Sequence, residues 1–282
     1  MNQRVAVITG CSSGFGLLST VELARKGYFV IATMRDLARR DSLDEALLSA
    51  GVAERVSVRT LDVASPPSHE TFVAETVAEF GRIDVLVNNA GFALAGFAED
   101  VMLEELRRQF ETNFFGTVSL TRAVLPVMRK QRAGRIVMIS SVSGRNAYPG
   151  ISSYASSKFA LEGYTEALRL EMAPLGIHCV LVEPGSFQTA IWNRKENNAV
   201  HAFDPTSPNR ERILRYRDYV QKQTRRGDPR EVARLIAHVA DVQHPRLRYV
   251  IGEDARSSLA FRALLPWRLY ETIVSRVLKL DK

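Results

Sequence analysis

Residues 4–27 read RVAVITGCSSGFGLLSTVELARKG, and most of the fold follows from this pattern. Its first part is a short, β-branched apolar run of the kind that forms a buried parallel strand. A loop with three glycines comes next, followed by a helical pattern that stops at Gly27. Glycines in a loop often mark only a turn. The order of strand, glycine loop and helix, however, is typical of dinucleotide binding.

Each glycine of this loop has a separate expected role. Gly10 permits a tight turn, Gly14 lets backbone N–H groups approach a pyrophosphate, and Gly16 permits close helix packing. The N-terminus of the following helix then faces the negative charge of the phosphates. The loop therefore predicts a phosphate-binding site.

The rest of the chain repeats the alternation of strand and helix. Further strand-like runs lie at residues 28–33, 55–61, 83–87, 134–140, 177–182 and 248–251, with helical patterns between most of them. This predicts an α/β fold of the Rossmann type, a doubly wound, seven-stranded, mainly parallel sheet with helices on both faces. We expect one catalytic domain over residues 1–255. Its polar, irregular segment 186–227, which contains Trp192, follows a strand end and is interpreted as a substrate loop or lid.

Composition restricts the class of protein. The 282 residues are 46% hydrophobic and 24% charged, which is ordinary for a soluble globular protein. Neither a signal-peptide layout nor an apolar run of membrane-spanning length is present. Cys11 and Cys179 are the only cysteines, which favours a reducing, cytoplasmic location.

The net charge of +7 is concentrated in the last part of the chain, where residues 205–282 carry 17 Lys and Arg against 9 Asp and Glu. No nucleic-acid-binding motif accompanies this charge, so we expect no nucleic-acid partner.

The second strand bears on the choice of cofactor. A carboxylate after this strand binds the adenosine ribose of NAD and repels a 2′-phosphate. Met34 stands at the aligned position and Arg35 comes next, which favours NADP(H) over NAD(H). Asp36 leaves the alternative open, because a slip of one residue would make it the ribose ligand.

Residues 141–158 read SVSGRNAYPGISSYASSK and hold the main candidates for chemistry. Tyr154 and Lys158 are four apart in a helical pattern and therefore share a face. A neighbouring ammonium favours phenolate, so we expect the pKa of Tyr154 to fall. Ser141 follows a strand and can hold a substrate oxygen together with Tyr154. Taken alone, Tyr-x-x-x-Lys is more often an ordinary helix face with a solvated lysine.

Weaker signals lie at other strand ends. Asp62 can bind an adenine amino group or merely cap a turn. The run Asn88-Asn89-Ala90-Gly91 lets backbone pass close to a planar ligand, although its asparagines can simply lock neighbouring strands. Asn113 is a poor residue within a long helical region at 100–130, which suggests a local distortion. No metal site is expected.

The C-terminal residues 256–282 form an amphipathic extension. Apolar residues from Trp267 to Leu278 recur at helical spacing, with Arg268, Arg276 and Lys279 elsewhere on the helix. Such a stripe either packs on its own domain or another subunit, which we favour, or lies on a membrane surface.

TGCSSGFG, NNAG, Asn113, Ser141, Tyr154-x-x-x-Lys158 and PGSFQT occur in this order, and together they resemble the short-chain dehydrogenase/reductase family. The chain is most similar to the branch of 17-beta-hydroxysteroid and retinol dehydrogenases, through TGCSSGFG, ATMRD and YASSKFALEG. The likeness is close over residues 4–190 and looser to about 255. Ser13 departs from the many NADP-dependent members that carry a basic residue in the glycine loop, which leaves phosphate selectivity mostly to Arg35.

The resemblance implies roles for individual residues. Tyr154 would be the acid/base, Lys158 would lower its pKa and hold the nicotinamide ribose, Ser141 would orient the substrate oxygen, and Asn113 would position a water. The implied cofactor contacts are Gly10, Ser12, Ser13, Gly14, Phe15, Gly16, Arg35, Asp62, Val63, Asn89, Ala90, Gly91, Tyr154, Lys158, Pro184, Gly185 and Thr189.

The implied function is NADP(H)-dependent interconversion of a carbonyl and a secondary alcohol, on a hydrophobic, steroid-like or bulky ketone substrate. The resemblance also implies a homodimer or homotetramer. Two alternatives stay open: a non-catalytic NADP(H)-binding sensor or scaffold, and a membrane-peripheral dehydrogenase of retinol or lipid alcohols that is anchored by the tail.

Overall fold

A computed structural model describes residues 3–189, 191, 197–222 and 226–278 of the chain. Seven strands form within two residues of their predicted ends. The strands are β1 (Val5–Thr9), β2 (Phe29–Met34), β3 (Val56–Thr60), β4 (Val85–Asn88), β5 (Gly134–Ile139), β6 (Ile177–Pro184) and β7 (Arg248–Ile251). The α-helices are α1 (Gly14–Arg25), α2 (Asp41–Ala50), α3 (Pro67–Phe80), α4 (Leu103–Phe110), α5 (Gly116–Gln131), α6 (Ser152–Met172), α7 (Arg210–Lys222), α8 (Pro229–Asp241), α9 (Glu253–Leu264) and α10 (Trp267–Val277).

The strands form one parallel sheet in the order β3-β2-β1-β4-β5-β6-β7. The order reverses direction between β1 and β4, so the chain winds outward from the centre of the sheet in both directions. This confirms the predicted doubly wound, Rossmann-type fold. Because all strands run the same way, their carboxyl ends meet at one edge, where such folds bind ligands.

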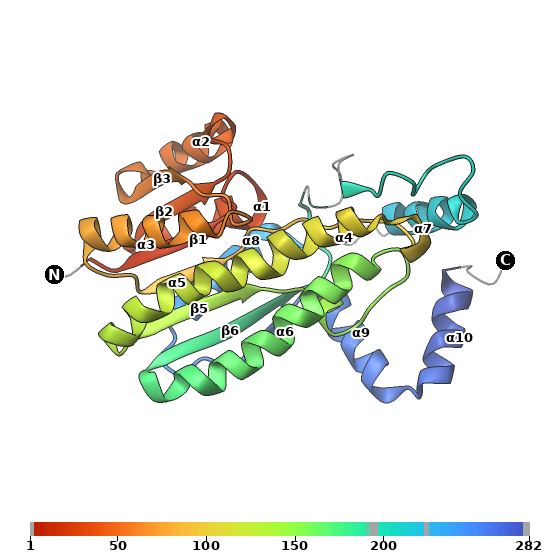
Figure 1. Cartoon of the computed structure of the whole chain (residues 1–282). Coiled ribbons are helices and arrows are strands. Elements are labelled where there is room, and N and C mark those ends of the chain that lie inside the picture. Colours follow the sequence, from red (N-terminus) through yellow and green to blue (C-terminus); the bar gives the residue numbers. More distant parts are fainter. Residues whose placement is uncertain (1–2, 190, 192–196, 223–225, 279–282) are drawn as a thin grey trace.

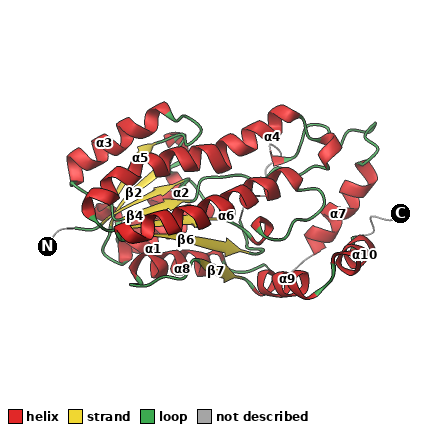
Figure 2. Cartoon of the chain, turned by 60° about the horizontal axis from the view of Figure 1, so that its bottom comes forward, coloured by secondary structure: helices red, strands yellow, loops and turns green. Residues whose placement is uncertain are grey.

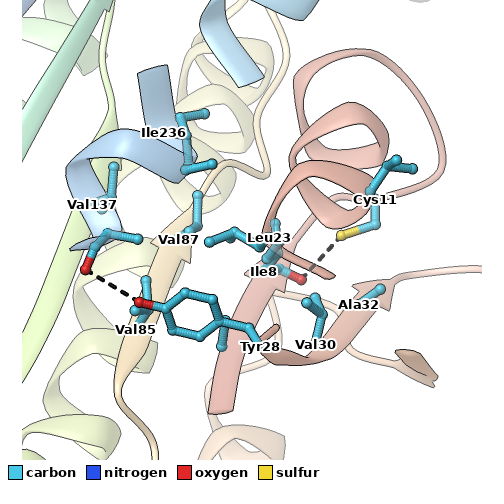
Figure 3. Close-up of a cluster of buried hydrophobic side chains, with 14 of the residues drawn as sticks. Ile8, Cys11, Leu23, Tyr28, Val30, Ala32, Val85, Val87, Val137 and Ile236 are labelled. Carbon is cyan, nitrogen blue, oxygen red and sulfur yellow. Dashed lines mark hydrogen bonds between the residues drawn. The ribbon is translucent and has the colours of Figure 1, made fainter. Parts of the chain in front are cut away.

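Alternating side chains of the strands pack into two cores, one on each face of the sheet. Ile8 and Val87 face the core formed with α1, α2 and α8, whereas Val7 and Leu86 face the core formed with α3, α5 and α6. Figure 3 shows part of the first core, where Tyr28 lies among strand valines. The Tyr28 hydroxyl donates to the Ala240 carbonyl at 3.3 Å, which fixes the end of α8 against β2.

The region beyond the carboxyl ends of the strands differs from the sequence-based expectation. Segment 186–227 was expected to be irregular, yet α7 forms within it, while Trp192 lies outside the described residues. The predicted domain boundary at residue 255 falls inside α9. Figures 1 and 2 show α7, α9 and α10 together at the end of the molecule opposite the N-terminus. Within the described part of the chain, no helix is long and apolar enough to span a membrane.

The helical region around Asn113 is distorted, as its sequence suggests. Residues Glu111–Phe115 form a π-helical turn between α4 and α5. Gly116 is the first residue of α5. A Cβ atom on this residue would lie 2.1 Å from the Val63 carbonyl oxygen, so a residue with a side chain does not fit here. The turn and this glycine bring Asn113 to the carboxyl edge of the sheet.

Gly16 tests how tightly the glycine loop is packed. A Cβ atom there would lie 2.3 Å from the Gly10 carbonyl oxygen, which is backbone and cannot move aside. We expect Gly16→Ala to lower the free energy of unfolding by about 1–3 kcal/mol in urea denaturation. Gly163 in α6 is the control: nothing lies within 4 Å of a Cβ there. Gly163→Ala should raise stability by about 0.5–1 kcal/mol. Wild-type stability of Gly16→Ala would contradict the close approach.

Candidate active site

A cleft of about 1130 Å³ opens at the carboxyl edge of the sheet. It runs from the glycine loop past the ends of β2, β4, β5 and β6 to α10. All of the predicted site residues line it except two, Gly16 and Asn113, which lie behind its wall. The structure therefore brings most of the predicted residues together along one cleft, although they come from segments more than 170 positions apart.

The glycine loop is held by a network between the ends of β1 and β4. Gly10 and Gly14 have φ values of +72° and +59°, which side chains rarely adopt. The Thr9 hydroxyl accepts from the backbone N–H groups of Asn89 and Ala90 at 3.0 and 2.9 Å. The Asn89 amide donates to the Thr9 carbonyl at 2.7 Å. The strand-locking role of Asn89, one of the two alternatives for this residue, is thus present in the structure.

The end of β2 presents a cation to the cleft. Met34 is 2% exposed, and Arg35 is exposed and lines the cleft. The Asp36 carboxylate accepts from the Ala38 N–H at 3.0 Å and lies 3.9 Å from Arg39. Arg35, Asp36 and Arg39 all line the cleft after β2, so both a cation and a carboxylate stand at this position.

Asp62 and Val63 follow β3 and line the cleft beside Arg35. The Asp62 carboxylate accepts from the Ala64 N–H at 3.0 Å, the turn contact that the sequence left open as an alternative. On the other side of the cleft, the Gly185 N–H donates to the Ile251 carbonyl at 2.9 Å. A Cβ at Gly185 would lie 2.3 Å from Asp254 Oδ1, so glycine allows the chain after β6 to pass α9.

Ser141, Tyr154 and Lys158 meet in the middle of the cleft. Ser141 follows β5, and its hydroxyl accepts from the Ser143 N–H at 3.1 Å and is a hydrogen-bond partner of Tyr154. The Lys158 ammonium donates to the Ile139 carbonyl at 2.8 Å and lies 5.8 Å from the centre of the Tyr154 ring. Tyr154 and Lys158 are each 5% exposed. Lys158 is thus not a solvated surface lysine.

The expected fall in the pKa of Tyr154 is wrong for this structure. Burial raises the pKa of Tyr154 to about 12, because desolvation of the phenolate outweighs its hydrogen bond with Ser141. Burial also lowers the pKa of Lys158 to about 8, against a smaller opposing effect of the Glu162 carboxylate. The four-residue spacing predicted proximity, but it could not reveal how strongly both groups are desolvated.

Asn113 fixes the backbone that borders this group. Its side-chain oxygen accepts from the Phe92 N–H at 3.1 Å, and its amide donates to the Phe92 carbonyl at 2.9 Å and to the Ser157 hydroxyl at 3.2 Å. A Cβ at Gly91 would lie 3.0 Å from Asn113 Oδ1 and 3.9 Å from Lys158 Nζ. Asn113 therefore joins the loop after β4 to the helix that carries Lys158.

Among the polar residues of the cleft that the sequence reasoning missed, four form a connected group. Asn146 donates to Tyr148 and to Ser258 at 3.1 and 2.8 Å, and Tyr270 donates to Asn146 at 2.8 Å. Tyr148 and Ser258 also share a hydrogen bond. These contacts fasten α9 and α10 to the loop after Ser141. Residues so far apart in the chain gave no periodic signal that links them.

Comparison with known proteins agrees with this geometry. The family model for short chain dehydrogenase matches residues 4–199. The uncharacterized oxidoreductase YusZ of Bacillus subtilis is 43% identical, with 99% of each chain covered. Human retinol dehydrogenase 8 is 39% identical over 87% of this chain and 80% of its own.

Solved structures show the same fold. A short-chain dehydrogenase from Streptomyces avermitilis has a TM-score of 0.82 and 33% identity, covering 100% of this chain and 98% of its own. The structure of ElxO with NADP bound has a TM-score of 0.75 and 26% identity over 90% of this chain and 99% of its own. The fold, the cleft and the relatives together identify the chain as an NAD(P)-binding oxidoreductase. The chain belongs to the short-chain dehydrogenase family.

The buried Lys158 predicts a specific pH dependence of stability. Its pKa is about 8 in the folded protein against the ordinary 10.5, so the unfolded chain binds more protons between these values. Stability contributed by this site should therefore rise with pH by roughly 2–3 kcal/mol from pH 8 to 10.5. The buried Cys11 and Cys179 thiols have raised pKa values and titrate in the opposite sense, so the contribution of Lys158 should appear as the difference in stability between the wild type and Lys158→Met, measured by urea unfolding across the range. Lys130→Met, at an exposed position of α5, should keep the wild-type profile; a wild-type profile for Lys158→Met would contradict the prediction.

Proposed function

We propose that this protein is an NADP(H)-dependent oxidoreductase that interconverts a carbonyl and a secondary alcohol on a bulky hydrophobic substrate. The observation that carries the proposal is the buried group of Ser141, Tyr154 and Lys158 at the middle of the cleft. A non-catalytic binding protein has no need for a desolvated ammonium beside a desolvated phenol.

The cleft suits a phosphorylated dinucleotide. The loop from Gly10 to Gly16 opens at the N-terminus of α1, where backbone N–H groups and the helix dipole favour phosphate. Arg35 would hold a 2′-phosphate, and Asp62 and Val63 would border the adenine. Asn89, Ala90 and Gly91 would line the ribose and nicotinamide, opposite Pro184, Gly185 and Thr189. The NADP bound to ElxO, which shares the fold, supports this choice over NAD.

Proton transfer is the part of the reaction that the chain itself performs. When bound, the nicotinamide supplies or accepts the hydride. Ser141 orients the carbonyl oxygen and Tyr154 donates a proton to it. The pKa of Tyr154 lies well above neutrality, so the phenol carries the proton that reduction requires. Lys158 stabilises the resulting phenolate, and Asn113 holds the backbone beside the lysine, where a water would link it to solvent.

The far wall of the cleft is apolar and favours a large hydrophobic substrate. It is formed by Ile273, Val274, Val277 and Leu278 of the C-terminal extension. Tyr270 is 4% exposed and holds this wall in place through Asn146, whereas Trp267, whose ring centre lies 5.7 Å from that of Tyr270, is 58% exposed. The C-terminal extension therefore forms one wall of the cleft. The similarity to retinol dehydrogenase 8, named for a lipophilic alcohol, supports this substrate class.

We further propose a cytoplasmic homodimer or homotetramer assembled through α5 and α6. Phe115, in the π-helical turn before α5, and Phe159 and Leu170, on α6, are 50%, 45% and 78% exposed. Large apolar groups exposed on neighbouring helices are typical of a subunit interface.

Tyr154→Phe tests the acid/base. We expect kcat for NADPH-dependent ketone reduction to fall by about 10²–10⁴-fold, since the phenol no longer supplies the proton. NADPH affinity, followed by fluorescence titration, should stay unchanged. The assay uses a panel of small and bulky ketones with NADPH and NADH, and the bulky ketones should react best. Tyr164→Phe, on the same helix but outside the cleft, is the control. Wild-type turnover of Tyr154→Phe would refute the assignment.

Arg35→Ala tests the cofactor. Loss of a charged contact to the 2′-phosphate should raise the KM for NADPH by about 10–100-fold and leave the KM for NADH nearly unchanged. Arg40 pairs with Asp44 at 2.6 Å and does not line the cleft, so Arg40→Ala should leave both values unchanged. Equal losses for the two cofactors in Arg35→Ala would show that Arg35 does not select the phosphate.

A further inference from the structure

A cluster of charged side chains lies directly behind the catalytic lysine. It consists of Glu162 on α6, Glu183 at the end of β6, Arg248 on β7 and Arg145 after the Ser141 loop, and we call it the carboxylate cluster. Arg248 Nε lies 3.1 Å from Glu162 Oε2 and 3.1 Å from Glu183 Oε1. Arg145 lies 3.2 Å from Glu183 Oε2. One guanidinium is thus shared by two carboxylates.

The cluster contains more buried negative than positive charge. The side chains of Glu162 and Glu183 are 5% and 0% exposed, while Arg248 is 25% and Arg145 42% exposed. Glu166 also pairs with Arg248, at 3.2 Å, but is 54% exposed and therefore screened by water. Both buried carboxylates pair with Arg248, which is less exposed than Arg145. The four groups balance in number, but among the described residues of the cluster deeply buried carboxylates are in excess over deeply buried guanidiniums.

This excess lies against the residues that carry the chemistry. Glu162 follows Lys158 by one helical turn, so the two side chains leave the same face of α6. Gly144, in the loop after Ser141, packs against both: a Cβ there would lie 3.0 Å from Glu162 Cγ and 3.2 Å from the Lys158 carbonyl. The same Cβ would lie 2.8 Å from Ser140 Oγ. The loop and the helix therefore meet directly over the carboxylate cluster.

Lys158 needs such a counter-charge. Its ammonium donates to the neutral Ile139 carbonyl, and Tyr154 is uncharged at neutral pH. A buried ammonium without a negative partner tends to lose its proton. Among the charged groups around it, Glu162 is the one that opposes the loss.

We propose that Glu162 is a positioning residue of the active site, whose buried carboxylate keeps the Lys158 ammonium protonated while the carboxylate cluster holds the Ser141 loop against α6. The proposal rests on the proposed function only for the role of Lys158 in turnover. Its electrostatic part concerns the protein alone.

The cluster also makes this support dependent on pH. Burial, with the neighbouring Glu183, raises the pKa of Glu162 to about 7, against the opposing effect of Arg248. Glu183 has a raised pKa for the same reason of burial, offset by Arg145 and Arg248. Glu162 therefore carries its full charge only above neutrality, where Lys158 begins to lose its own proton. The two titrations are coupled.

The test follows Lys158 directly by NMR in the full-length protein labelled with [13Cε]-lysine, with the signal assigned from Lys158→Arg. In the wild type, the Lys158 signal should show two inflections, one from Glu162 near pH 7 and one from its own titration at higher pH. Glu162→Gln keeps the shape of the side chain. It should remove the first inflection and move the second to lower pH. The kcat/KM for ketone reduction at pH 9, relative to pH 7, should then fall about 3–10-fold further than in the wild type.

Two variants separate charge from structure. Glu162→Asp keeps the carboxylate and should retain both inflections and the wild-type pH profile. Glu166→Gln removes the exposed partner of the same Arg248 and should also leave them unchanged. Coincident Lys158 titrations in Glu162→Gln and the wild type would overturn the proposal. If Glu162→Gln does not fold, a single inflection in the wild type overturns it. Because the NMR titration needs no substrate, absence of ketone turnover would count against the proposed function and not against this inference.

Discussion

The Lys158 ammonium is 5% exposed and donates to the Ile139 carbonyl at 2.8 Å, where β5 ends. An ammonium is costly to remove from water, so this position requires that α6 pack firmly on the sheet and that negative charge lie nearby. Ile139 supplies a carbonyl only because the strand stops there, and Asn113 ties the loop after β4 to the same helix. The π-helical turn and Gly91 are among the features of the cleft that help to position the Lys158 ammonium.

The parallel sheet makes such a site possible. The carboxyl ends of its strands lie at one edge of the sheet, and the loops that follow the strands begin at this edge. Thr9 shows how closely the loops are fitted, since its hydroxyl accepts N–H groups from two successive residues of the β4 end. The glycine loop is thereby fixed relative to Asn89 and Ala90 before any ligand is considered. A cradle that is already ordered loses less conformational entropy on binding.

Desolvation shifts the pKa values of Tyr154 and Lys158 in opposite directions. It raises the pKa of Tyr154 to about 12 and lowers that of Lys158 to about 8, so both neutral forms are favoured. A protonated phenol is the form that gives a proton to a carbonyl oxygen. The carboxylate cluster behind α6 acts against the second effect and preserves the charge of Lys158. Apolar side chains of α10 line another wall of the same cleft.

The sequence by itself determined the fold and most of the cleft. The alternation of strands and helices, the positive φ angles of Gly10 and Gly14, and the shared helix face of Tyr154 and Lys158 depend on residues a few positions apart, and such local preferences survive into the structure. Packing over the whole chain decided the rest. The bond from Tyr270 to Asn146 spans 124 positions, and the pairing of Glu183 with Arg248 joins two strands. The direction of the Tyr154 pKa shift belongs to this second group, because desolvation depends on everything that surrounds a residue rather than on its neighbours in the chain.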